Sequence, residues 1–166
     1  MSGKTSFSWS TYKYCNNDDG TGMTKYTIPD GQSGIWYNDG SFVGDNKTVL
    51  EAGDDAATAN WGGAWRMPTE EELNELRKNC TWTLTTLNGV DGYNVEGPNG
   101  KSIFLPAAGY IFGELLYQEA SISYYWSSSL NTSNSNFARG LTFATASYNC
   151  DYGNRCYGRS VRPVCE

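Results

Sequence analysis

The chain has 166 residues, a net charge of −6 and an aromatic content of 14%. This length suits a single domain with one core, and the aromatic content and low overall charge argue against a disordered protein. The negative net charge argues against a nucleic-acid binder, which needs clustered lysine and arginine to neutralise phosphates.

The first part of the chain, residues 1–50, is rich in glycine and asparagine, and we expect irregular loops there. Its beginning, "MSGKTSFSWS", lacks the hydrophobic centre of a signal peptide. No apolar run anywhere in the sequence is long enough to span a membrane. We therefore expect no direct insertion into a membrane.

A helical part follows over residues 51–80. A short helix is expected over 54–60, ending at Gly62-Gly63. A second helix is expected over 68–80, because Thr69 can cap it and Glu72 completes a capping box. The glutamates of its first turn favour the positive end of the helix dipole, so we interpret them as helix-stabilising residues rather than an acid/base cluster.

The remaining part, residues 81–166, is rich in β-forming residues. Good turn sequences at Asn88-Gly89 and Pro98-Asn99-Gly100 separate three short runs, which predicts a meander. Further strands are expected over 123–129, 137–145 and 159–164. Helices followed by antiparallel strands predict one α+β domain over residues 1–166.

The five cysteines are an odd number, so at least one thiol is unpaired within the chain. Spacing leaves two bridges open, Cys150–Cys156 and Cys80–Cys165, because connectivity does not follow from sequence. The chain has no histidine and no CxxC pair, which argues against a zinc site. We expect no metal and no cofactor.

The tail differs chemically from the rest of the chain. Residues 1–120 carry a net charge of −8, whereas residues 121–166 carry +2 from four arginines, one aspartate and one glutamate. Of the 46 residues from 121 onward, 19 are serine, tyrosine or asparagine, a composition that antibody paratopes share. Tyrosine and arginine dominate interface energetics, so the tail is a candidate binding surface.

Four motifs occur together and in order: "NWGGAWRMPTEEELNEL" (60–76), "SIFLPAAGY" (102–110), "YYWSSS" (124–129) and "SVRPV" (160–164). In these motifs the chain resembles the Fibrobacter-type major paralogous domain, a bacterial and phage module. The resemblance implies a C-type-lectin-like fold, with two helices packed on short antiparallel sheets and long irregular loops. Members of gut Bacteroidales and their phages include the variable proteins of diversity-generating retroelements, in which adenine-directed mutagenesis scrambles codons near the C-terminus.

The resemblance also divides the tail, over about residues 124–164, into scaffold and diversified positions. Tyr125 to Ser129, Leu141, Phe143, Arg155 and Val161 to Val164 match the scaffold. Cys150 and Cys156 would be chance products of mutagenesis. The positions that match the diversified ones, and that we take as ligand-binding, are Asn131, Asn134, Asn136, Arg139, Thr142, Ser147, Asn149, Asp151, Tyr152, Asn154, Tyr157 and Arg159.

The expected function is non-catalytic display of a binding surface. Its ligand would be a protein or other cell-surface molecule, met on a bacterial surface or a phage virion. We expect Tyr148, Asp151, Tyr152, Asn154 and Tyr157 to line one accessible face. Family members usually have a further strand upstream of the point where this sequence begins; completion of the sheet by another chain leaves a homo-oligomer open.

Two other functions are weighed against this one. Formylglycine-generating oxidases share the broad fold and use a pair of cysteines near the C-terminus, a role that Cys150 and Cys156 can be imagined to fill. Catalysis that depends on a histidine base is excluded by composition. A calcium-dependent sugar-binding lectin would use the oxygen-rich stretches 16–22 and 51–55, although Asx turns explain both more simply.

Overall fold

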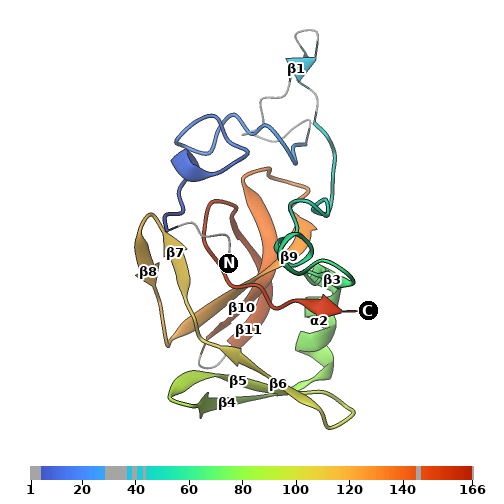
Figure 1. Cartoon of the computed structure of the whole chain (residues 1–166), viewed down its shortest axis with the longest axis vertical. Helices are drawn as coiled ribbons and strands as arrows, with labels where there is room; N and C mark the ends of the chain where they lie inside the picture. The colour runs from blue at the N-terminus through green and yellow to red at the C-terminus, as the bar shows by residue number, and fades with distance from the viewer. Residues whose placement is uncertain (1–4, 29–36, 39–40, 43, 145–146, 166) are drawn as a thin grey trace.

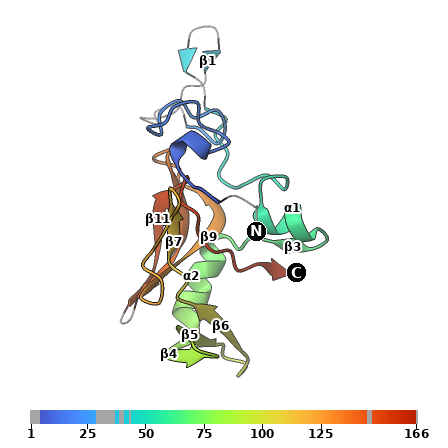
Figure 2. The ribbon, with the colours of Figure 1, turned by 60° about the vertical axis from the view of Figure 1, so that its left-hand side comes forward.

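The computed structural model describes residues 5–28, 37–38, 41–42, 44–144 and 147–165. Antiparallel sheets dominate and helices are few, so the expected α+β class is confirmed. Figure 1 shows a three-stranded sheet at the centre, with a helix along one side and a second three-stranded sheet at one end. The N-terminal loops lie at the opposite end of the long axis, also in the turned view of Figure 2.

Where the structure describes the N-terminal part, its regular elements are one 3-10 turn, η1 (Trp9–Thr11), and two short paired strands, β1 (Tyr37–Asn38) and β2 (Ser41–Phe42). The Asp54 carboxylate holds the loops in place, because it accepts hydrogen bonds from Lys25 (2.6 Å), Tyr26 (2.7 Å) and Tyr14. Burial raises the pKa of Asp54, but these three bonds outweigh it and keep that pKa below its usual value.

Both predicted helices form. In α1 (Ala56–Trp61) the Asp55 carboxylate accepts hydrogen bonds from the first free amides, and Gly62 ends the helix with φ of 65°. In α2 (Glu70–Asn79) Thr69 and Glu72 form the expected capping box. The strand β3 (Trp65–Arg66) lies between them.

The meander is confirmed as β4 (Thr81–Leu87), β5 (Val90–Glu96) and β6 (Ser102–Pro106), in that spatial order. Its first turn uses Asn88 and Gly89, both with positive φ (51° and 80°). This is the backbone that a two-residue hairpin of type I′ requires.

Two elements of the second half were not predicted. A hairpin pairs β7 (Tyr110–Phe112) with β8 (Leu115–Tyr117). The second is β11 (Ser147–Asn154), which lies between two predicted strands and pairs with β10 (Phe137–Ala144). With β9 (Ile122–Leu130) on the other side of β10, these strands form the central sheet, in the order β11-β10-β9.

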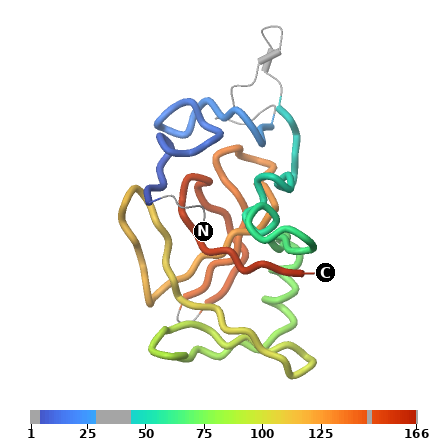
Figure 3. The backbone as a smooth tube through the Cα atoms, viewed as in Figure 1, coloured from blue at the N-terminus to red at the C-terminus, as the bar shows by residue number. Residues whose placement is uncertain are grey.

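The strand predicted over 159–164 is wrong for most of its length. Only β12 (Val164–Cys165) is a strand, and it pairs with β3. Residues before it make single bridges instead, from Gly158 to Ile111 and from Ser160 to Tyr125. Pro163 lacks the amide hydrogen that a continuous ladder would need. Figure 3 shows this last segment, in red, crossing the middle of the molecule toward β3.

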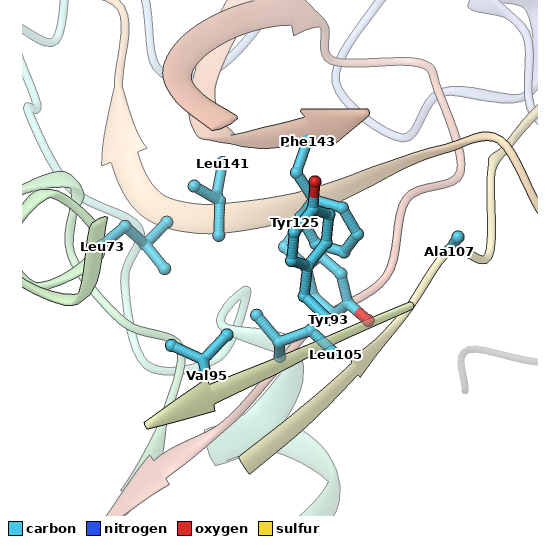
Figure 4. Close-up of a cluster of buried hydrophobic side chains, with 8 residues drawn as sticks. All are labelled: Leu73, Tyr93, Val95, Leu105, Ala107, Tyr125, Leu141 and Phe143. Carbon is cyan, nitrogen blue, oxygen red and sulfur yellow. The ribbon is translucent and has the colours of Figure 1, made fainter. Parts of the chain in front are cut away.

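The core lies between the central sheet, α2 and the β4–β6 sheet (Figure 4). The buried side chains come from all three and are Leu73, Tyr93, Val95, Leu105, Ala107, Tyr125, Leu141 and Phe143. Among the described residues, the ring centres of Tyr93 and Phe143 lie 5.3 Å apart inside this core, whereas Trp82 packs at its border. The predicted scaffold residues Leu141 and Phe143 are each 1% exposed.

Arg155, which matches a scaffold position, makes several hydrogen bonds inside the molecule. Its guanidinium is buried and donates hydrogen bonds to the carbonyl oxygens of Lys25, Tyr26 and Ser135 and to the Tyr12 hydroxyl. These bonds connect the turn after β11 with the N-terminal loops. In the described part of the chain, no helix has both the length and the apolar character needed to cross a membrane.

Candidate ligand-binding surface

The register of β11 against β10 decides which way the side chains of the tail point. Tyr148 lies opposite Phe143, and Cys150 lies opposite Leu141. Both therefore belong to the inner face of the sheet, where they pack against the core and α2. The Tyr148 ring stacks on Trp82 at 4.6 Å.

The opposite side of the sheet carries the residues between these. Side chains alternate along a strand, so Ser147, Asn149 and Asp151 point away from the core, and all three are exposed. Thr142 lies opposite Asn149 on the same side. We call this side the outer face; its members are Tyr124, Trp126, Thr142, Ser147, Asn149, Asp151 and Arg159.

The expectation of one accessible face is therefore wrong. Tyr152 lies opposite Arg139 on the inner side of the sheet, beyond the end of the core. Its ring remains 50% exposed and packs on Phe137 at 4.9 Å. Arg139 lies 3.6 Å from the Glu70 carboxylate at the start of α2. The two-residue period of a strand separates these positions from the outer face.

The three asparagines of the β9–β10 loop shape the loop. Asn131 is 7% exposed, and its side-chain oxygen accepts hydrogen bonds from the backbone amides of Ser133 and Asn134. The Asn134 side chain accepts one from the amide of Asn136. These are Asx turns, and Asn131 is buried where it holds the loop together.

Asn154 and Tyr157 flank the turn after β11. The Asn154 side-chain amide donates to the Tyr157 hydroxyl at 3.0 Å. The Tyr157 ring in turn lies 5.1 Å from the ring of Tyr110 and 5.3 Å from that of Phe112, both in β7. Tyr157 thus connects the tail with the β7–β8 hairpin.

This hairpin completes an aromatic cluster that the sequence reading missed. Its members are Tyr110, Phe112, Tyr117, Tyr124 and Tyr157. Beside it, Leu115 is 63% and Leu116 50% exposed. The hairpin, though not the cluster, could have been predicted from "YIFGELLY", in which two apolar runs flank Gly113-Glu114.

Arg159 lies where the cluster meets the outer face. Its guanidinium carbon is 4.1 Å from the ring centre of Trp126 and 4.7 Å from that of Tyr124. Burial among these rings lowers the pKa of Arg159 to about 10, so the side chain is still charged at neutral pH. The rings partly balance this charge through cation–π attraction.

No match was found when the chain was compared with family models, with curated proteins and with solved structures.

The cysteines do not form a paired site. No disulfide joins the described cysteines, so neither of the two bridges left open by the sequence is present. Cys150 packs at the border of the core, whereas Cys156 is 2% exposed. Burial raises the pKa of both thiols, that of Cys156 to about 11. A nucleophilic cysteine needs a lowered pKa, so both environments disfavour thiolate chemistry.

The oxygen-rich stretches are engaged in structural contacts. The Asp19 carboxylate accepts hydrogen bonds from the backbone amide and the hydroxyl of Thr21, as expected for an Asx turn. Asp55 caps α1 and also accepts the amide of Met67. Asp54 is bound to lysines, as described above. Within the described residues, no three acidic or cysteine side chains come together as a metal site.

A cavity of about 370 Å³ opens beside the core. It is lined from the meander by Leu84, Asp91 and Tyr93 and from β10 by Phe143. None of the predicted ligand-binding residues lines it.

Proposed function

We propose that the chain is a non-catalytic binding domain with a C-type-lectin-like fold, whose C-terminal sheet recognises a macromolecular ligand. One observation carries the proposal: along β11, exposed polar residues alternate with residues that pack on the core. Ser147, Asn149 and Asp151 can thus change while Tyr148 and Cys150 keep the strand in place. A rigid backbone beneath replaceable side chains is what a display surface requires.

Stability supports this division. A substitution at an exposed position typically changes the free energy of unfolding by less than about 0.5 kcal/mol. Truncation of a buried leucine or phenylalanine, such as Leu141 or Phe143, costs about 2–5 kcal/mol. Ser147, Asn149 and Asp151 can therefore be changed while the domain stays folded.

We further propose that this variation is made by a diversity-generating retroelement, and that the domain works on a bacterial surface or a phage virion. The "YYWSSS" and "SVRPV" motifs on either side of the outer-face positions support this. Binding would need no cofactor. The absence of histidine from the sequence and the raised thiol pKa values support a function without catalysis.

Two matched display libraries test the binding function. The first randomises Ser147, Asn149 and Asp151 together; the second randomises their inner neighbours Tyr148 and Cys150 with Leu141. We expect most members of the first library to stay folded, and selection against purified bacterial surface proteins to enrich binders from it. The second library should be mostly unfolded. Equal losses of folding in both libraries would contradict the proposal.

The retroelement has its own test in the surrounding DNA. We expect a near-copy of the segment encoding residues 124–164, differing only at adenines, beside a reverse-transcriptase gene. An intact locus without this template would remove the proposed source of variation but leave the binding surface in place.

A further inference from the structure

Arg159 is bound differently from the other arginines described above. Arg66 forms two hydrogen bonds with the Glu72 carboxylate, and Arg155 donates to carbonyl and hydroxyl oxygens. Arg139 lies near a carboxylate. Arg159 has only rings around it: its Nε and Nη1 atoms are buried without a hydrogen-bond partner. Among the described residues, no carboxylate lies within ion-pair distance of it.

The aromatic rings compensate the charge of the buried guanidinium but do not accept its hydrogen bonds. Stacking on Trp126 and Tyr124 balances the positive charge over the flat faces of the group. The N–H bonds, however, point outward in its plane and need oxygen acceptors. A buried polar group without such acceptors is unfavourable, and a charged one more so. The Nε and Nη1 groups of Arg159 therefore each lack an oxygen acceptor.

Gly153 determines where the guanidinium can lie. It is the residue of β11 that follows the exposed row on the outer face, and a Cβ built there would be 1.8 Å from Nη2 of Arg159. The group therefore occupies the space that any other residue at position 153 would fill. The third ring, that of Tyr157, is farther away at 5.9 Å and lies outside the regular strands.

We propose that Arg159 binds a carboxylate of a protein ligand, an aspartate or glutamate side chain or a chain terminus. A carboxylate oxygen accepts a short, charge-assisted hydrogen bond from a guanidinium N–H, so it would supply the partner that Nε or Nη1 lacks. We expect Tyr157 to be the ring that moves to admit it. The neighbouring aromatic cluster and the exposed Leu115 and Leu116 fit apolar side chains, which favours a protein over an acidic sugar. The inference rests on the proposed binding function.

Nuclear magnetic resonance of the arginine Nε–H groups tests this directly. The probe is a capped peptide, acetyl-Gly-Glu-Gly-amide, and its neutral match has Gln in place of Glu. We expect a saturable shift of the Arg159 Nε–H signal with the Glu peptide, and binding about tenfold weaker or worse with the Gln peptide. No saturable shift, or equal shifts with both peptides, would overturn the proposal. A stronger response to N-acetylneuraminic acid would replace the protein ligand with an acidic glycan.

Three variants complete the test. Arg159→Lys keeps the charge but loses the fork, so we expect binding of the Glu peptide to fall at least about fivefold. Gly153→Ala keeps the arginine but displaces it, with a similar loss. Arg162→Lys, at an exposed position three residues away, is the matched control and should bind as the parent does. If Arg159→Lys binds the Glu peptide as the parent does, the proposal is wrong; thermal melting of each variant separates lost binding from lost folding.

The inference and the proposed function can fail separately. If the Arg159 Nε–H signal does not shift with the Glu peptide, the library of Ser147, Asn149 and Asp151 can still yield binders. If the library yields no binders, the carboxylate binding by Arg159 can still be observed with the peptide. Only the proposal that Arg159 serves to bind a macromolecular ligand would then be lost.

Discussion

The contrast between Tyr148 and Asn149 gives the sharpest test of the alternating strand. These neighbours in β11 point to opposite sides of the sheet, the tyrosine onto Trp82 and the asparagine toward solvent. Full burial of an aromatic side chain removes about 150–250 Å² from water, worth about 4–6 kcal/mol at about 25 cal/mol per Å². Tyr148 is mostly buried, so we expect Tyr148→Ala to lower the free energy of unfolding by about 3–4 kcal/mol.

Asn149→Ala removes a side chain without partners in the core and should cost less than about 0.5 kcal/mol. Urea unfolding followed by tryptophan fluorescence measures both values, and the slopes of the two transitions should agree. The neighbouring indole of Trp82 makes the fluorescence sensitive to this region. If the two variants lose the same stability, residues 147–154 do not form a strand with an inner and an outer face.

Three further predictions concern the scaffold. Hydrogen bonds from Arg66 lower the pKa of Glu72 to about 2. The stability that this pair contributes is therefore present above about pH 4.5 and is lost as the pH falls toward 2. In urea titrations at several pH values, Glu72→Gln should lose less stability over this range than the parent does. Gly113→Ala meets open space at φ of 60° and should cost about 1–2 kcal/mol, whereas Gly109→Ala places a Cβ 2.1 Å from a backbone oxygen and should cost more in thermal melts. Equal costs would contradict this account. Cys156 should react with iodoacetamide only after unfolding, as peptide mass spectrometry can show; labelling of the folded protein would disprove its burial.

Much of the scaffold could be predicted because its signals are local. The capping box of Thr69 and Glu72 and the Asn88-Gly89 turn each set a few backbone angles through residues close in sequence. β11 carries no such signal. Its sequence "SYNCDYGN" is poor in the branched residues typical of strands, and it forms a strand because β10 offers it a partner along its full length.

The candidate site was predicted only in part for the same reason. The outward positions Ser147, Asn149 and Asp151 were correctly expected to be accessible. Their separation from Tyr152 depends on a register that only the paired strand sets. The aromatic cluster joins β7, β8, β9 and the turn after β11, and no short stretch of sequence reveals contacts between elements so far apart.

The contacts of Arg155 tie together residues that are 129 to 143 positions apart. The N-terminal loops therefore gain this anchor only after the ribosome has added Arg155. Closing such long loops costs entropy before any contact rewards it, which slows folding. A shift of the turn after β11 should thus also loosen the N-terminal loops, at the end of the molecule opposite to the meander.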